Sequence, residues 1–371
     1  MSNPYVTEPP EAWPTLGPGS LTPRERVYMS LAHRQPDRVP IDFWAVPELW
    51  ERLLSAMGGI TREELLQTLE VDIRWVAPDY VGPEAGLPGG GYVDHYGAWR
   101  KAVRNEFSIY HEYAGYPLAD AKTAADVHDW EWPQTESWDM DSVPPKLKEL
   151  DAQGDYFVCY DLGGIFERSW GLVGLERFLM DLATNPEVPC AIMDCMTDLY
   201  IANVTRLLRA TGERIDMVYT WDDVAHQHGL MVSPAMWRRH ILPRHLRLNA
   251  AIREFNVKLM YHSCGAIYPL IPALIEEAGI DVLNPLQPRA AGMDMSRIKE
   301  EFGRRISFHG GVDIQHTLPH GTAEEVRQEV QDRCRVLGPG GGYILAPSHY
   351  MQNDTPLENT LAFYRTPRDV G

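Results

Sequence analysis

The sequence Tyr-His-Ser-Cys-Gly at 261–265 places a histidine and a cysteine two residues apart at the end of an apolar run. In a β-strand, residues two apart face the same side, so the His262 imidazole and the Cys264 thiol are expected to point together. Zinc binds nitrogen and thiolate ligands of this kind and needs a third ligand from elsewhere in the chain. His349, at the end of the last apolar run, is the candidate for it. A buried His–Cys pair without metal is the alternative.

Three carboxylates beyond other apolar runs could act as an oxygen ligand or as a general acid or base, and with His349 they form the predicted catalytic set. Asp222 and Asp223 are sequence neighbours. Neighbouring residues of an extended chain point in opposite directions, so the two are not expected to face one pocket equally. The alternative role for one of them is to cap the helix that follows. The third carboxylate is Glu167.

Eight short apolar runs, rich in β-branched and aromatic residues, alternate with helix-length segments. This alternation indicates a parallel sheet that is covered on both faces. Eight is also the number of strands that closes a (β/α)8 TIM barrel. A doubly wound open sheet is the alternative, although no Gly-x-Gly-x-x-Gly follows the first run. The runs are 39–44, 72–77, 156–161, 217–222, 257–262, 281–286, 306–311 and 343–348.

The predicted fold class is therefore α/β, with a single TIM barrel over residues 21–371 and two additions. Residues 1–20 contain five prolines and are expected to form an N-terminal arm. Residues 86–118 alternate like antiparallel strands and are expected to form a β-rich insertion over the barrel mouth. A surface excursion without a role in binding is the alternative.

Active sites of TIM barrels lie at the carboxyl ends of the strands, so polar and aromatic side chains at or beyond the ends of the runs are candidates for substrate binding. Core packing is the alternative for at least half of the aromatic ones. The candidates are Trp44, Tyr80, Trp170, Trp221, Asn284, Gln287 and His309.

The 371 residues carry 34 Lys plus Arg and 52 Asp plus Glu, a formal net charge of 34 − 52 = −18. An acidic protein is poorly suited to nucleic acid, whose phosphates require a basic surface. No apolar stretch approaches the roughly 20 residues of a membrane span. The first residues lack the features of a signal peptide, and the five cysteines are an odd number. Reduced thiols and a cytoplasmic location are therefore expected, and a homodimer is compatible with the sequence.

Four segments are typical of one family: LTPRERVYMSLAHRQPDRVPIDF, HSCGAIYPLIPALIEEAGIDVLNPLQ, FGRRISFHGGVD and GGGYILAPSHYMQNDTPLENTLAFY. With them the chain resembles the uroporphyrinogen decarboxylase superfamily, and within it the cobamide-dependent methyltransferase branch. The resemblance covers residues 21 to 364 and implies a TIM barrel, in agreement with the count of runs.

The resemblance implies different sites for the two branches. In the methyltransferase branch, zinc is held by the His-x-Cys pair, which matches His262 and Cys264, and by a late cysteine, whose place His349 takes here. In the decarboxylases, a pocket aspartate matches Asp72 or thereabouts, which adds Asp72 to the substrate-binding candidates, and a late histidine matches His349. The arginine-rich motif of the decarboxylases is missing from the matching loop in 41–54. Without it, an acidic pocket is poorly suited to an eight-carboxylate substrate.

The resemblance therefore predicts a zinc-dependent methyltransferase of the demethylase type, which moves a methyl group between a small donor or acceptor and a corrinoid. The sequence lacks the cobalamin-binding pattern Asp-x-His-x-x-Gly, so the corrinoid is expected on a separate partner protein. A metal-free decarboxylase-like lyase that uses Asp72 and His349 is the alternative. A non-catalytic barrel that binds a tetrapyrrole or a partner is the third interpretation.

Overall fold

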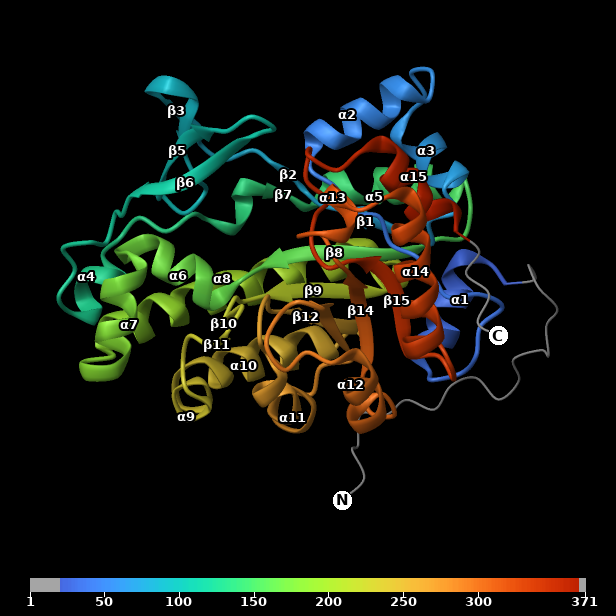
Figure 1. The fold of residues 1–371 in the computed structure, drawn as a ribbon. Helices are drawn as coiled ribbons and strands as arrows, with labels where there is room; N and C mark the ends of the chain where they lie inside the picture. The colour runs from blue at the N-terminus through green and yellow to red at the C-terminus, as the bar shows by residue number, and fades with distance from the viewer. Residues whose placement is uncertain (1–20, 367–371) are drawn as a thin grey trace.

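The computed structural model describes residues 21–366, so the predicted arm over 1–20 lies outside the described residues. Seven parallel strands form a curled sheet in the order β1-β8-β9-β12-β13-β14-β15 (Figure 1). Seven of the eight apolar runs supply these strands, so the predicted α/β barrel-like architecture is confirmed. The strands are β1 (Ile73–Val76), β8 (Phe157–Gly163), β9 (Met217–Trp221), β12 (Lys258–His262), β13 (Val282–Leu286), β14 (Ser307–Val312) and β15 (Tyr343–Pro347).

The first predicted run, 39–44, is not a regular strand, although it occupies the eighth position of the barrel. Ile41 forms a single parallel bridge with Leu345 of β15, and the Asp72 N–H donates to the Ile41 carbonyl at 3.0 Å. The segment therefore lies between β15 and β1 and links the two edges of the sheet. Pro40 has no N–H to donate, which interrupts the ladder that a regular strand would form.

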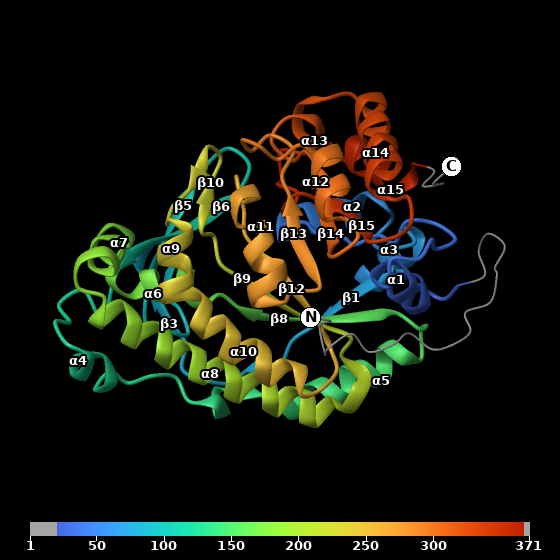
Figure 2. The same ribbon diagram turned by 90° about the horizontal axis from the view of Figure 1, so that it is seen from below.

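Helices cover the outer face of the strands (Figure 2). Thr22 caps the first of them, α1 (Pro23–Leu31), with a capping box. Thr322 forms another capping box at the start of α14 (Ala323–Leu337). The other long helices are α2 (Pro47–Ala56), α5 (Val143–Asp151), α6 (Ile165–Val173), α7 (Leu175–Thr184), α8 (Glu187–Thr211), α10 (Leu242–Arg253), α12 (Met295–Phe302) and α15 (Leu357–Arg365).

Alternate residues of the strands point into the barrel and pack there as a separate apolar cluster. In β8, for example, Phe157 and Cys159 belong to this inner cluster, whereas Val158 and Tyr160 belong to the larger core between sheet and helices. Toward the carboxyl ends the inward positions become polar. The apolar layers therefore form a floor beneath the end of the barrel at which the polar side chains gather.

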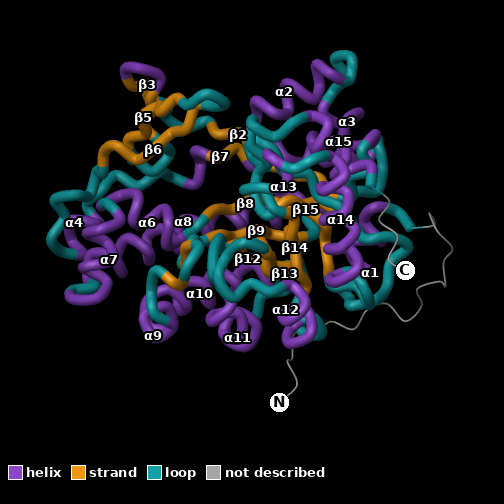
Figure 3. The backbone as a smooth tube through the Cα atoms, viewed as in Figure 1, coloured by secondary structure: helices purple, strands orange, loops and turns teal. Residues whose placement is uncertain are grey.

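Residues 85–115 form a second, antiparallel sheet that stands apart from the barrel strands (Figure 3). The tip of its last hairpin reaches the loop after β15, where Asn353 donates to the Phe107 carbonyl at 2.6 Å and Tyr110 donates to Gln352 at 3.1 Å. The sheet therefore extends across the carboxyl end of the barrel. Its strands are β3 (Ala85–Leu87), β4 (Gly91–Val93), β5 (Trp99–Arg104) and β6 (Ile109–Gly115).

The length and apolar character of the helices decide whether any of them could span a membrane. Within residues 21–366, none is both long enough and apolar enough to cross a bilayer.

Candidate metal centre

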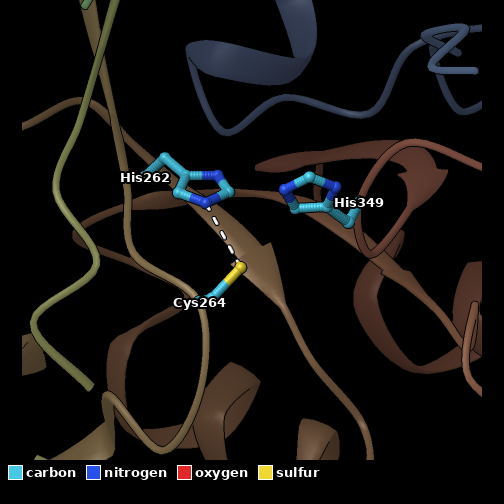
Figure 4. Close-up of side chains that lie close together, drawn as sticks. All are labelled: His262, Cys264 and His349. Atoms are coloured by element: carbon cyan, nitrogen blue, oxygen red, sulfur yellow. Dashed lines mark hydrogen bonds between the residues drawn. The ribbon is translucent and has the colours of Figure 1, made fainter. Parts of the chain in front are cut away.

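The three predicted metal ligands meet at the carboxyl end of the barrel. His262 ends β12, Cys264 follows in the next loop, and His349 lies two residues beyond β15. One ligand atom from each lies within 4.8 Å of the other two. Figure 4 shows the two imidazole rings and the thiol facing one another. His262 at the end of β12 therefore meets Cys264 of the following loop, and the barrel brings His349 to them.

The spacing and chemistry of these atoms fit a zinc ion. Zn–N bonds of about 2.0 Å and Zn–S bonds of about 2.3 Å in a tetrahedral site imply an N···S separation of roughly 3.5 Å. His262 Nε2 and Cys264 Sγ lie 3.3 Å apart. Burial and the neighbouring His262 lower the pKa of His349 to about 4, so its ring is neutral at pH 7 and keeps a lone pair for a metal. Two imidazoles and a thiol are a suitable zinc set.

The cluster has negative partners that favour a cation. Burial would lower the pKa of His262, but the Cys264 sulfur and the Asp223 carboxylate outweigh it, and the net pKa is raised well above the usual value. Asp223 Oδ1 lies 3.4 Å from His262 Nε2. Burial raises the pKa of the Cys264 thiol, against the effect of His262. A proton on Nε2 and a divalent cation would therefore compete for the same position.

The two neighbouring aspartates point in opposite directions, as extended backbone requires. Asp223 faces the cluster and accepts the Cys264 N–H at 2.7 Å. Burial alone would raise the pKa of Asp223, but the hydrogen bond with His262 lowers it overall. Asp222 points away, where its carboxylate contacts His245 Nε2 at 2.7 Å and accepts the Glu167 N–H at the start of α6 at 3.0 Å. Asp222 thus supports helices, and Asp223 reaches the site.

Glu167 is a carboxyl group poised for proton transfer beside the cluster. Burial, followed by the charge of Asp223, raises its pKa to about 7. The charges of Asp222 and His262 also act on it, because its carboxyl lies near both. A carboxyl group with such a pKa exists in both protonation states near neutral pH, as a general acid or base requires.

Asn284 and His309, both predicted to bind substrate, lie instead in the barrel interior and have no solvent exposure. Asn284 Oδ1 lies 2.5 Å from His262 Nδ1, and Asn284 Nδ2 lies 2.6 Å from His309 Nδ1. His309 Nε2 lies 3.1 Å from Oδ2 of Asp42. Sequence reasoning missed Asp42, whose only signal was a carboxylate inside the first apolar run.

The remaining polar candidate and two of the tryptophans support the site. Gln287 accepts the Gly265 N–H at 2.6 Å and so holds the loop that carries Cys264. Trp44 is buried against His309 and stacks on Tyr350, the neighbour of His349, with ring centroids 5.0 Å apart. Trp221 donates its indole N–H to Asp161 at 3.0 Å at the end of β8.

Two cavities lie near these residues and share residues 77–78 in their linings. The larger, about 650 Å³, is lined by Trp44 and Tyr350 among others. The smaller, about 210 Å³, is lined by Tyr80 and Asp161 among others. Trp170 lines neither cavity and packs on Tyr113 between α6 and the antiparallel sheet.

Asp72 lies at the opposite end of the barrel from the cluster. It precedes the first residue of β1 and has no exposed surface. Its carboxylate pairs with Arg26 at 2.6 Å and with Arg38 at 2.7 Å, and accepts the Ile41 N–H at 2.8 Å. The structure therefore does not bring Asp72 and His349 together.

Comparisons with known proteins agree with this architecture. A methyltransferase structure from Methanosarcina mazei superposes with a TM-score of 0.66 at 19% identity, covers 93% of this chain and 97% of its own, and shows the shared fold. A methylated-thiol–coenzyme M methyltransferase of the same species is 26% identical over 199 residues, or 54% of this chain. The match spans about half, 49%, of that protein.

A uroporphyrinogen decarboxylase of Syntrophotalea carbinolica is 24% identical over 257 residues, which are 64% of this chain and 67% of that enzyme. Residues 121–370 match the uroporphyrinogen decarboxylase (URO-D) family. This match covers more than half of the sequence, and the chain belongs to the URO-D family.

Proposed function

We propose that this protein is a zinc-dependent methyltransferase of the demethylase type, which moves a methyl group between a small substrate and a corrinoid carried on a partner protein. The observation that carries the proposal is the meeting of His262, Cys264 and His349, whose ligand atoms lie within 4.8 Å of one another. The likeness to a methyltransferase that acts on methylated thiols supports the same class of reaction. The engagement of Asp72 in ion pairs at the far end of the barrel argues against the lyase alternative.

Bound zinc would supply a Lewis acid that polarises the oxygen or sulfur of the substrate. The chain's own residues perform the remaining tasks. Asp223 orients the Cys264 loop through the backbone N–H and adds negative charge beside the ligands. Glu167 is placed to exchange a proton with the atom that loses or gains the methyl group.

The substrate would lie beside His349, against the aromatic wall that Trp44 and Tyr350 form. Both rings also line the larger cavity, and this aromatic lining suits the apolar part of a small methyl donor or acceptor. A corrinoid protein would approach the same end of the barrel, where the antiparallel sheet lies across the mouth.

Zinc content tests the proposal. The purified chain is expected to hold about one zinc per polypeptide, measured by mass spectrometry of the metal. Removal with a chelator is expected to abolish methylation of cob(I)alamin by small methyl ethers and thioethers, and added zinc is expected to restore it. The proposed mechanism requires one zinc ion in each polypeptide. Activity that survives complete removal of metal would exclude the proposal.

The pH dependence of turnover is expected to report Glu167. Because its pKa is raised to about 7, the carboxyl is protonated below that pH and loses its proton above it. A reaction that needs a proton donor should therefore slow as the pH rises through this pKa. A divalent cation bound nearby would stabilise the carboxylate and lower the pKa.

Glu167→Gln should remove the decrease of kcat with rising pH and slow turnover by about 10²- to 10⁴-fold. The matched control is Glu176→Gln on the exposed face of α7, which should leave the profile unchanged. If the pH dependence of kcat were unchanged in Glu167→Gln, a group other than Glu167 would transfer the proton.

A further inference from the structure

An unbroken chain of hydrogen bonds crosses the barrel beneath the candidate metal centre. It runs from Asp42 to His309, then to Asn284 and then to His262. Asp42 belongs to the segment at 39–44, and the other three residues belong to the neighbouring strands β14, β13 and β12. The three contacts measure 3.1, 2.6 and 2.5 Å. None of the four residues is more than 4% exposed. Water therefore does not interrupt the chain, and each member depends on its neighbour for hydrogen bonding.

The chemistry of Asp42 sets the direction of every bond in this chain. A carboxylate only accepts hydrogen bonds, and Asp42 also accepts the indole N–H groups of Trp44 and Trp75 and the Phe43 N–H. His309 must therefore donate from Nε2. In the neutral ring its Nδ1 is then an acceptor, so Asn284 must turn its amide N–H toward His309.

The same constraint passes on to the metal ligand. Once the amide N–H of Asn284 faces His309, its carbonyl oxygen faces Nδ1 of His262 and can only accept. His262 must then carry a proton on Nδ1. Its other nitrogen, Nε2, points toward Cys264 Sγ at 3.3 Å and is the nitrogen left to bind a metal. The orientation of the amide therefore follows from the carboxylate at the end of the chain.

We propose that Asp42 and His309, acting through Asn284, are positioning residues that hold the His262 proton on Nδ1 and reserve Nε2 for the metal. This inference rests on the proposed zinc centre for its purpose, but its claim about the His262 tautomer stands on the hydrogen bonds alone. Partners outside the ligand shell commonly fix metal-bound histidines in this way, and their loss weakens metal binding. Asn284 and His309 therefore serve the ligand, and substrate contact is left to the wall around Trp44.

The test is Asp42→Asn, studied in the metal-free and the zinc-loaded full chain. An amide offers an N–H as well as an oxygen, so His309 is no longer obliged to donate and the direction of the chain is lost. Nitrogen-15 imidazole spectra of the metal-free protein, recorded at a pH high enough for the His262 ring to be neutral, should change from one His262 tautomer to a mixture. Zinc affinity, measured by competition with a chromophoric chelator, should fall by about 10- to 100-fold.

A second substitution separates the relay from simple damage to packing. In Asn284→Asp, the new carboxylate accepts from His262 Nδ1 regardless of what Asp42 presents, so the tautomer and zinc affinity should be retained. Adding Asp42→Asn in that background should then have no further effect on zinc affinity. His309→Phe breaks the chain at another point, should weaken zinc binding as Asp42→Asn does, and serves if Asp42→Asn does not fold.

The outcomes are distinguishable. A single, unchanged His262 tautomer and wild-type zinc affinity in both Asp42→Asn and His309→Phe would overturn the relay. An equal loss of zinc affinity with and without Asn284→Asp would also overturn it, because packing would then be the cause. If the wild-type chain bound no zinc but the tautomer still changed in Asp42→Asn, the relay would stand and the zinc-dependent function would fall.

Discussion

Replacing Cys264 with alanine is expected to remove zinc from the protein and to abolish methyl transfer. In the proposed centre the thiolate would supply one of three protein ligands, and only two imidazoles would remain to hold the ion. Loss of Lewis-acid stabilisation worth several kcal/mol corresponds to a fall in kcat/KM of about 10³-fold or more. Zinc per chain and the rate of cob(I)alamin methylation measure the two effects.

The matched control for this substitution is Cys195→Ala. Cys195 on α8 is also a half-buried thiol beside an imidazole, with its sulfur 3.7 Å from Nδ1 of His128, but it has no third ligand nearby in the part of the chain that the structure describes. Zinc content and activity should survive this change. If Cys264→Ala retained one zinc per chain and full activity, the thiol would not be a ligand and the proposed centre would be wrong.

The clustering of His262, Cys264 and His349 was predictable because it follows from local periodicity and from a rule for barrels. The rule that residues two apart on a strand face one side predicts the contact of His262 with Cys264, which the structure shows although Cys264 lies just beyond β12. The carboxyl ends of all strands meet at one end of a barrel, which brings His349 to them. Neither step requires knowledge of how one strand is aligned with the next.

The positions of Asn284 and His309 were predictable only in part, because their partners depend on the alignment of neighbouring strands. Both are inward polar residues near strand ends, which in sequence resemble substrate contacts. Whether such a side chain faces a cavity or a neighbouring strand depends on register, and β13 pairs with β14 through an irregularity between Leu283 and Leu286. No single sequence predicts that shift, so the contacts of Asn284 with His262 and His309 could not be foreseen.

The first apolar run shows a second feature that could not be predicted from the sequence. Residues 39–44 look like a strand by composition, and Pro40 explains why the structure has only isolated bridges there. Asp42 points into the barrel because three N–H donors besides His309 surround it. These donors come from Phe43, Trp44 and Trp75, and only the folded barrel brings Trp75 to the others.

Asp72 is expected to be essential for stability rather than for catalysis. Asp72→Ala would leave the buried guanidinium of Arg26 without one of its two carboxylate partners, and Arg38 would also lose a partner. Breaking a buried ion pair from one side costs about 3 to 5 kcal/mol, because an uncompensated charge remains in the interior. Urea unfolding at pH 7 should show a loss of this size in the free energy of unfolding.

The control is Asp79→Ala, which removes the ion pair of similar length, 2.7 Å, between Asp79 and Lys146. The Asp79 side chain is 63% exposed and the Lys146 side chain 39%. Because water screens exposed pairs, this change should cost less than about 1 kcal/mol. Folded Asp72→Ala protein should still bind zinc, since Asp72 lies at the amino end of β1, away from the ligands. A stable Asp72→Ala variant that retains zinc but loses all activity would instead place Asp72 in the chemistry and revive the lyase alternative.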